Sequence, residues 1–208
     1  MDENRKFVLE AQVERTMKAL AKNQMPAVYA PTKAAAVKAV EAMLREGETI
    51  SCGGSVTLAE SGIRDLMKSG RYQFIDREEM DPREAYLKTF DADVFLTSAN
   101  AITEDGELYN VDGNGNRVAA MTFGPASVIL VVGANKIVRD LAEAEQRVKE
   151  FAAPANCKRL ACKTPCAVTG KCADCSGDGR ICCTAVVHRQ QRIPGRIKVI
   201  LVEESLGY

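Results

Sequence analysis

The sequence predicts an α/β protein built on an open, mostly parallel sheet with flanking helices, plus a C-terminal cysteine-rich segment. Three observations support this fold class. Segments with helical periodicity alternate with short apolar segments, which is typical of parallel strands joined by helices. The run Ser-Val-Ile-Leu-Val-Val at 127–132 is apolar on both faces, as a central strand of such a sheet must be. A strand-like segment at 48–52 leads through Gly53-Gly54 directly into a helix.

The expected helices show apolar residues at helical spacing, such as Leu9, Val13 and Leu20 on one face of the first. Thr32 and Asp81 are placed as N-caps, the latter followed by a proline in the first turn. The helices are expected at 3–22, from Thr32 to Gly47, at 57–68, at 82–90 and at 139–152.

The expected strands are short apolar segments between these helices and turns. They are expected at 48–52, 72–75, 93–97, 107–111, 127–132, 185–189 and 197–202. The stretch between them at 99–124 is polar and rich in turn-forming residues such as Asp-Gly pairs. We therefore expect an α/β domain over 1–152, a cysteine-rich metal-binding segment over 153–183, and closing strands of the same domain over 184–208.

The composition limits the functions that the protein can have. Its 28 basic and 28 acidic residues give a net charge of zero, so no nucleic-acid-binding surface is expected. The opening residues are charged, unlike those of a signal peptide. The longest apolar run, at 127–133, is far too short to cross a membrane. We expect a cytoplasmic protein that is not inserted in a membrane.

The first candidate site is the turn Ser-Cys-Gly-Gly-Ser-Val-Thr-Leu at 51–58. Backbone N–H groups at a helix start attract phosphate or carboxylate groups. Gly53 and Gly54 allow a ligand to approach the backbone closely, and Ser55 and Thr57 add hydroxyl groups. The pattern matches neither a dinucleotide-binding fingerprint nor a Walker motif. The alternative is an ordinary strand-to-helix turn with a capping hydroxyl.

The second candidate site follows the strand expected at 93–97. It gathers polar and charged residues: Asn100, Glu104, Asp105, Asn116 and Arg117. In open α/β sheets, ligands bind beyond the carboxyl ends of strands. Arg117 could pair with an anion through two hydrogen bonds, and Glu104 or Asp105 could act as an acid or base. The alternative is a hairpin and loop rich in turn formers. If both sites face one end of the sheet, a single pocket is lined by Gly54, Ser55, Thr57, Asn100, Glu104 and Arg117.

Several motifs carry a resemblance to a known family. They are Gly53-Gly-Ser-Val-Thr-Leu-Ala-Glu-Ser-Gly-Ile63, Ser98-Ala-Asn-Ala-Ile-Thr-Glu-Asp-Gly106, Val132-Gly-Ala-Asn-Lys-Ile-Val138 and Lys163-Thr-Pro-Cys166-Ala-Val-Thr-Gly170. In this order they resemble the LUD-domain family, the lactate-utilisation proteins, and in particular its subset with a C-terminal cysteine cluster. The resemblance implies a fold similar to that of ribose-phosphate isomerases, CoA transferases and glucosamine-phosphate deaminases. It also implies a role in growth on lactate, through a multi-subunit oxidation system that contains iron–sulfur clusters.

Seven of the eight cysteines lie between Cys157 and Cys183. Thiolates gathered so closely either pair as disulfides or hold a soft metal, and a reducing cytosol favours the metal. Four thiolates suit a [4Fe–4S] cluster or, alternatively, Zn. The family pattern Cys-x5-Cys-x2-Cys-x6-Cys falls on Cys166, Cys172, Cys175 and Cys182. Cys162 is the spare ligand, and Cys157 is expected to pack in the interior.

Two classes of function remain. In the first, the protein is a metal-cluster-containing component of a lactate or 2-hydroxy-acid oxidation system, with other subunits of that system as partners. In the second, it is an enzyme or sensor that binds an anionic small molecule, such as a sugar phosphate or a CoA-type compound, and its cysteines hold structural zinc. The bound metal distinguishes the two, because an iron–sulfur protein is coloured and a zinc protein is not.

Two single residues outside these groups are expected to have structural roles. Cys52 is expected to be a buried thiol rather than a nucleophile, since no histidine lies near it in the sequence to activate it. His188 is the only histidine, and its alternation with apolar residues suggests an exposed or edge position in a strand. With one histidine, neither a histidine-rich metal site nor a conventional serine triad is expected.

Overall fold

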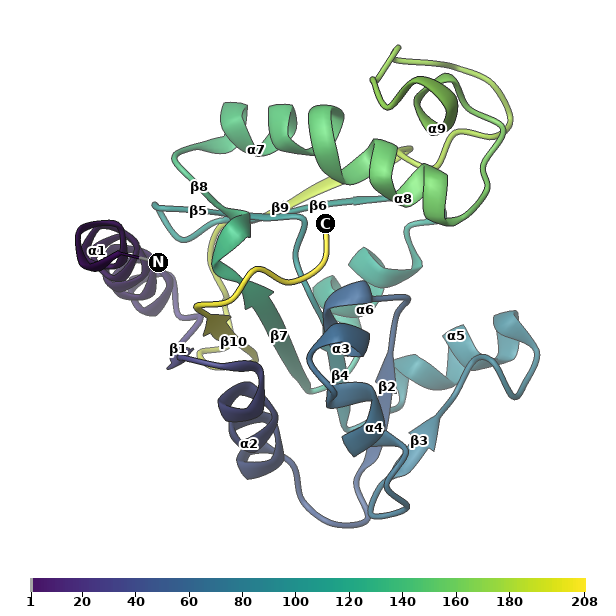
Figure 1. The fold of residues 1–208 in the computed structure, drawn as a ribbon. Helices are drawn as coiled ribbons and strands as arrows, with labels where there is room; N and C mark the ends of the chain where they lie inside the picture. The colour runs from purple at the N-terminus through teal and green to yellow at the C-terminus, as the bar shows by residue number, and fades with distance from the viewer. Residues whose placement is uncertain (1) are drawn as a thin grey trace.

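The computed structural model describes residues 2–208, which form two sheets with helices around them (Figure 1). The larger sheet has six strands, and every neighbouring pair in it is parallel. In spatial order these strands are β1 (Ala27–Ala30), β10 (Ile197–Val202), β7 (Ser127–Gly133), β4 (Val94–Thr97), β2 (Thr49–Cys52) and β3 (Gln73–Ile75). The predicted fold class, an open and mostly parallel sheet with flanking helices, is confirmed.

A smaller sheet of four strands packs against one face of the larger one. In spatial order its strands are β8 (Ile137–Val138), β5 (Ala101–Thr103), β6 (Leu108–Asp112) and β9 (Thr184–His188). The two closing strands predicted after the cysteine segment therefore separate, and only β10 joins the larger sheet. β10 is buried over most of its length, whereas β9 begins with exposed residues and pairs antiparallel with β6 at an edge.

Both faces of the larger sheet are covered, as its apolar strands require. The helices on one face are α2 (Lys33–Met43), α3 (Val56–Glu60) and α4 (Ile63–Met67). The helices on the other side are α1 (Glu3–Lys22), α5 (Pro82–Phe90) and α6 (Asn116–Phe123). Within β7, Ile129 and Val131 point to the first face, and Val128 and Leu130 point to the second, where the smaller sheet also packs. The predicted central strand is therefore buried from both sides.

A long helical run covers the outer face of the smaller sheet (Figure 1). It consists of α7 (Leu141–Arg147), a π-helical turn (Val148–Ala152) and α8 (Ala153–Arg159), and the short helix α9 (Pro165–Thr169) follows. The sequence predicted that this helix ends at 152, where a domain boundary was also expected. It continues because Pro154 lies in the first turn of α8, a position that tolerates a residue without an N–H group.

Local capping explains where the predicted helices begin. The side chains of Asp2, Thr32 and Asp81 each accept a hydrogen bond from backbone N–H groups of the following turn. The helix predicted at 57–68 is instead two helices, α3 and α4. Gly62, with a φ of +80°, separates them, because a left-handed residue cannot continue a right-handed helix.

Candidate functional site

A cleft of about 530 Å³ opens at the carboxyl ends of the strands of the larger sheet. Ligands bind at this end in open α/β sheets. Four adjacent strands supply its base: Gly54–Thr57 follow β2, Ser98–Asn100 follow β4, Lys136 follows β7 and Tyr208 follows β10. The opposite wall comes from β6, α6, α8 and the cysteine segment, with Asp112, Asn116, Asn156 and Cys182 among its residues.

Most of the residues predicted to bind a ligand meet in this cleft. Gly54, Ser55, Thr57, Asn100, Asn116 and Arg117 all line it. Gly53 does not line it, because it faces the side chains of Phe95 and Arg117 beneath the turn. The glycine turn and the loop after β4 thus form one site, although they lie more than 40 residues apart in the sequence.

The charge on the cleft wall favours an anionic ligand. Five basic side chains line the cleft against two acidic ones, Asp112 and Asp178, and Asp112 is already neutralised by an ion pair with Arg117. Arg77 lies over the glycine turn, since a Cβ at Gly54 would stand 2.7 Å from its Nη2. Within residues 2–208, Arg77 makes no hydrogen bond or ion pair, so its guanidinium is available to a ligand.

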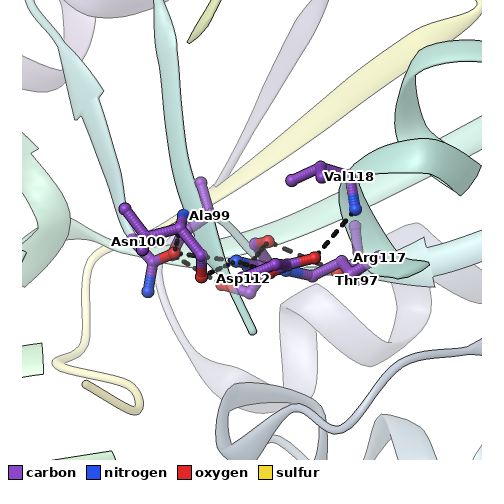
Figure 2. A network of polar contacts seen from close by, with 8 residues as sticks. Thr97, Ala99, Asn100, Asp112, Arg117 and Val118 are labelled. Carbon is purple, nitrogen blue, oxygen red and sulfur yellow. Dashed lines mark hydrogen bonds and ion pairs between the residues drawn. The ribbon is translucent and has the colours of Figure 1, made fainter. Parts of the chain in front are cut away.

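Arg117 holds the floor of the cleft together (Figure 2). Its Nε donates to Oδ1 of Asp112 at 2.7 Å, and its Nη2 lies 2.6 Å from the same oxygen in an ion pair and donates to Oδ1 of Asn100 at 2.8 Å. Further hydrogen bonds run from Arg117 to the carbonyl oxygens of Ser98 and Val111. The guanidinium is thus directed into the protein, and it positions Asn100 and Asp112 rather than presenting a free fork to an anion.

The two carboxylates suggested as an acid or base lie away from the cleft. Glu104 pairs with Arg15 at 2.9 Å and accepts a hydrogen bond from Gln12, both on α1. The backbone carbonyl of Asp105 accepts from Asn23, just beyond the same helix. The prediction that Glu104 lines the pocket is wrong, because the turn between β5 and β6 packs on α1 instead of facing the sheet end.

Lys136, the most buried basic residue of the cleft, is not among the predicted site residues. It is 3% exposed, and its Nζ donates to Oγ1 of Thr57 at 2.9 Å and to Oγ of Ser98 at 3.2 Å. Burial, together with the positive charges of Arg147 and Arg117, lowers its pKa from 10.5 to about 7. Its place four residues beyond the predicted central strand was the feature that could have revealed it.

The predicted metal ligands lie in two groups, and all eight cysteines are free thiols. Burial raises the pKa of Cys182, with further contributions from the neighbouring thiols of Cys172 and Cys175. Arg180 lies beside two of these three and donates to the carbonyl oxygens of Cys175 and Cys182. Within residues 2–208, no three histidine, cysteine or acidic side chains are arranged so that they could hold a metal ion.

The second cysteine group contains Cys157, Cys162 and Cys166. Burial raises the pKa of Cys157 to about 12, and the nearby thiols of Cys166 and Cys162 add to this rise. Cys157 is 2% exposed, as expected of a packing residue. Cys166 is also buried and lies 3.3 Å from the hydroxyl of Thr164. The assignment of Cys166 as a fourth ligand therefore remains a prediction.

Cys52 and His188 were each expected to have a structural role, and their surroundings can be compared with that prediction. Cys52 is half-buried rather than fully buried. Burial raises its pKa to about 11, although Arg64 and Arg77 oppose this, so a reactive thiolate is disfavoured. His188 is only 7% exposed, with Nε2 3.0 Å from the hydroxyl of Thr122, and burial lowers its pKa. β9 is an edge strand of the smaller sheet. The predicted exposure of His188 is wrong, because this face of β9 packs towards α6.

These features define an α/β protein with a cation-lined cleft at the carboxyl end of a parallel sheet, bordered by a cysteine-rich segment. The family model of the LUD domain matches residues 13–202, so the chain belongs to the LUD domain family. Among solved structures, the chain is similar to a DUF162 family protein from Deinococcus radiodurans, known from a crystal structure. The TM-score is 0.54 at 14% identity, over 93% of this chain and 98% of that chain, which shows a shared fold.

No curated protein matches the chain. The part of the chain that the structure describes contains no helix with the length and apolar character needed to cross a membrane.

Proposed function

We propose that this LUD-domain protein is a component of a lactate or 2-hydroxy-acid oxidation system. In this proposal the cleft binds a small carboxylate, and the cysteine segment carries a [4Fe–4S] cluster. One observation supports it most. Cys182, a proposed cluster ligand, lines the same cleft as Gly54 and Lys136. A cluster held there would lie beside the bound carboxylate, where electrons can pass between them.

The binding of a carboxylate rests mainly on two groups that have no partner among residues 2–208. Arg77 offers a free guanidinium that can bind a carboxylate through two hydrogen bonds. The amide nitrogen of Asn100 makes no hydrogen bond within residues 2–208, and in Figure 2 it points away from the Arg117 network. Arg159 adds charge at the cleft wall. A volume of about 530 Å³ also lies within the range of small-molecule sites, roughly 300–1,000 Å³.

We expect Arg77→Gln to weaken the binding of lactate or pyruvate by about tenfold or more, which corresponds to the loss of roughly 1.4 kcal/mol. The reason is that Arg77 is a cleft cation that has no partner among the residues the structure describes. Isothermal titration calorimetry measures the effect. Arg192→Gln is the matched control, since Arg192 is exposed and does not line the cleft. Equal affinities of the two variants would contradict a carboxylate site at the glycine turn.

The cysteine segment fits the proposed cluster in its donor chemistry. Iron–sulfur clusters are held by thiolates. Cys175 and Cys182 lie beside the Arg180 guanidinium, whose charge favours thiolates and an anionic cluster, and Cys172 lies near Cys182. Cys166 is proposed as the fourth ligand, and Cys162, in the same group as Cys166, as its substitute. When bound, such a cluster would accept and release single electrons.

Anaerobic purification should yield a brown protein that contains iron and acid-labile sulfide. We expect Cys175→Ser to lose most of the metal, because it removes one of four thiolates, whereas Cys157→Ser should keep it. Elemental analysis and the visible absorption spectrum measure this. The same metal content in wild type and Cys175→Ser would exclude Cys175 as a ligand.

A second candidate function is favoured by the cationic wall alone. Five basic side chains also suit a phosphate group, as in a sugar phosphate or a CoA-type compound, and the cysteines would then hold structural zinc. A colourless protein with stoichiometric zinc, and tighter binding of a sugar phosphate than of lactate, would support this function instead.

A further inference from the structure

The hydrogen bonds around Lys136 indicate which form of its amine the protein accommodates. Nζ lies 2.9 Å from Oγ1 of Thr57 and 3.2 Å from Oγ of Ser98. Each hydroxyl carries one proton. Thr57 donates its proton to the carbonyl oxygen of Leu206, and Ser98 donates to that of Ala99. Both hydroxyls therefore accept from Lys136, and these two bonds use two of its N–H groups.

The third position on Nζ has no acceptor among residues 2–208. In an ammonium group this position would carry a proton left without a partner in a buried site, which is costly. In a neutral amine it carries the lone pair, which needs no acceptor. The charged groups nearby act in the same direction. Arg147 and Arg117 disfavour the ammonium form, and Glu60 alone opposes them. With a pKa of about 7, much of Lys136 is a neutral amine near neutral pH.

The C-terminal residues shield this amine from solvent. A Cβ at Gly207 would lie 2.5 Å from Oγ1 of Thr57 and 3.3 Å from Nζ of Lys136, so the backbone passes directly over the pair. The segment is anchored, because the N–H of Gly207 donates to Glu60 and the N–H of Leu206 donates to Asn135. Lys136 nevertheless lines the cleft, and the cleft is therefore its route to a ligand.

We propose that Lys136 is a nucleophile that forms an imine with a small anionic carbonyl compound, of which a 2-oxo acid is the simplest. The lone pair of Nζ attacks the carbonyl carbon and forms a C–N bond. The C–O bond then breaks, and the oxygen leaves as water with the two protons of the amine. No electrons are transferred, so no oxidant or reductant is needed. A desolvated lysine beside other cations is a known arrangement for such a nucleophile.

The rest of the cleft fits the anionic part of such a compound. Arg77 is free to bind a carboxylate, and it lies over Gly54 on the turn that also provides Thr57. A 2-oxo acid is the product of oxidising a 2-hydroxy acid, so the inference rests on the carboxylate-binding part of the proposed function. It does not depend on the metal cluster.

Borohydride trapping tests this inference. The protein is incubated with pyruvate and sodium borohydride, which reduces an imine to a stable secondary amine, and the modified residue is located by peptide mass spectrometry. We expect one adduct, on Lys136. Lys136→Met should abolish it, whereas Lys158→Arg, which removes an exposed lysine outside the cleft, should not. Lactate has no carbonyl to condense and should give no adduct. Glyceraldehyde phosphate in place of pyruvate tests whether the carbonyl compound is a phosphorylated sugar.

The pH dependence separates Lys136 from surface lysines. The neutral fraction of a group with a pKa of about 7 rises roughly tenfold between pH 6 and pH 8, whereas that of an ordinary lysine rises about a hundredfold. We expect the rate of adduct formation at Lys136 to follow the smaller rise. If pyruvate binds by calorimetry but no adduct forms on Lys136, the inference is wrong and the carboxylate site stands. If neither pyruvate nor glyceraldehyde phosphate binds, the proposed function fails with it.

Discussion

Replacing Arg117 with methionine is expected to lower the free energy of unfolding by about 3–5 kcal/mol. The Asp112 side chain is 8% exposed and depends on Arg117 for its ion pair. Without the guanidinium, a carboxylate stays buried with only the backbone N–H of Val118 as a donor. Asn100 loses one of the two donors to its Oδ1 at the same time and keeps the N–H of Val111, so carboxylate binding should also weaken. Urea denaturation measures the stability change.

Two further variants make this result specific. Arg139→Met removes an exposed pair with Asp140 and should leave stability nearly unchanged, since surface ion pairs contribute little. Asp112→Asn combined with Arg117→Met should be more stable than Arg117→Met alone, because no unpaired charge remains. If Arg117→Met is as stable as wild type, the Asp112 pair does not support the cleft floor.

Gly106→Ala is expected to destabilise the protein by more than about 2 kcal/mol, since the left-handed conformation costs an ordinary residue about 1–2 kcal/mol. Gly106 has a φ of +77°, and a Cβ there would lie 2.6 Å from backbone atoms of Ala19 and Leu20 in α1. Backbone atoms cannot rotate away, so the turn between β5 and β6 must separate from α1. The packing that holds Glu104 against Arg15 should weaken with it.

Gly47→Ala is the matched control for this substitution. Gly47 has a φ of +80°, but a Cβ there would meet nothing within 4 Å. Its substitution therefore costs the conformational strain alone. Thermal and urea unfolding of both variants compare the two costs. Equal destabilisation would show that the contact between the turn and α1 adds no stability.

Local features of the sequence explain the elements that were predicted well. The cap at Thr32 and the cap and proline at 81–82 act within a single turn, so the helix starts could be placed from neighbouring residues. The run at 127–132 contains no polar residue after its first, which only a strand buried on both faces allows. The glycine turn and the loop after β4 were expected at one end of the sheet, and both line the cleft there, because both follow parallel strands and strand ends meet at one edge of a sheet.

Other elements depended on contacts between distant residues. Helix α6 lies where a polar loop was expected, and its start is set by Asp112, whose carboxylate accepts from the N–H of Val118. The edge pairing of β9 with β6 placed it in the smaller sheet and buried His188. In both cases a contact with another element, rather than the local sequence, decides the outcome.

The sequence by itself determined the fold class, the family, the order of most helices and strands, and the segments that border the cleft, because caps, turns and apolar runs act over a few residues. Only the tertiary structure decided the roles of the charged residues. It directed Glu104 to α1, enclosed Arg117 in hydrogen bonds and buried Lys136 between two hydroxyls. The sequence does not show which groups will surround a charged side chain. Its protonation and reactivity depend on the water and the partners around it in the folded chain.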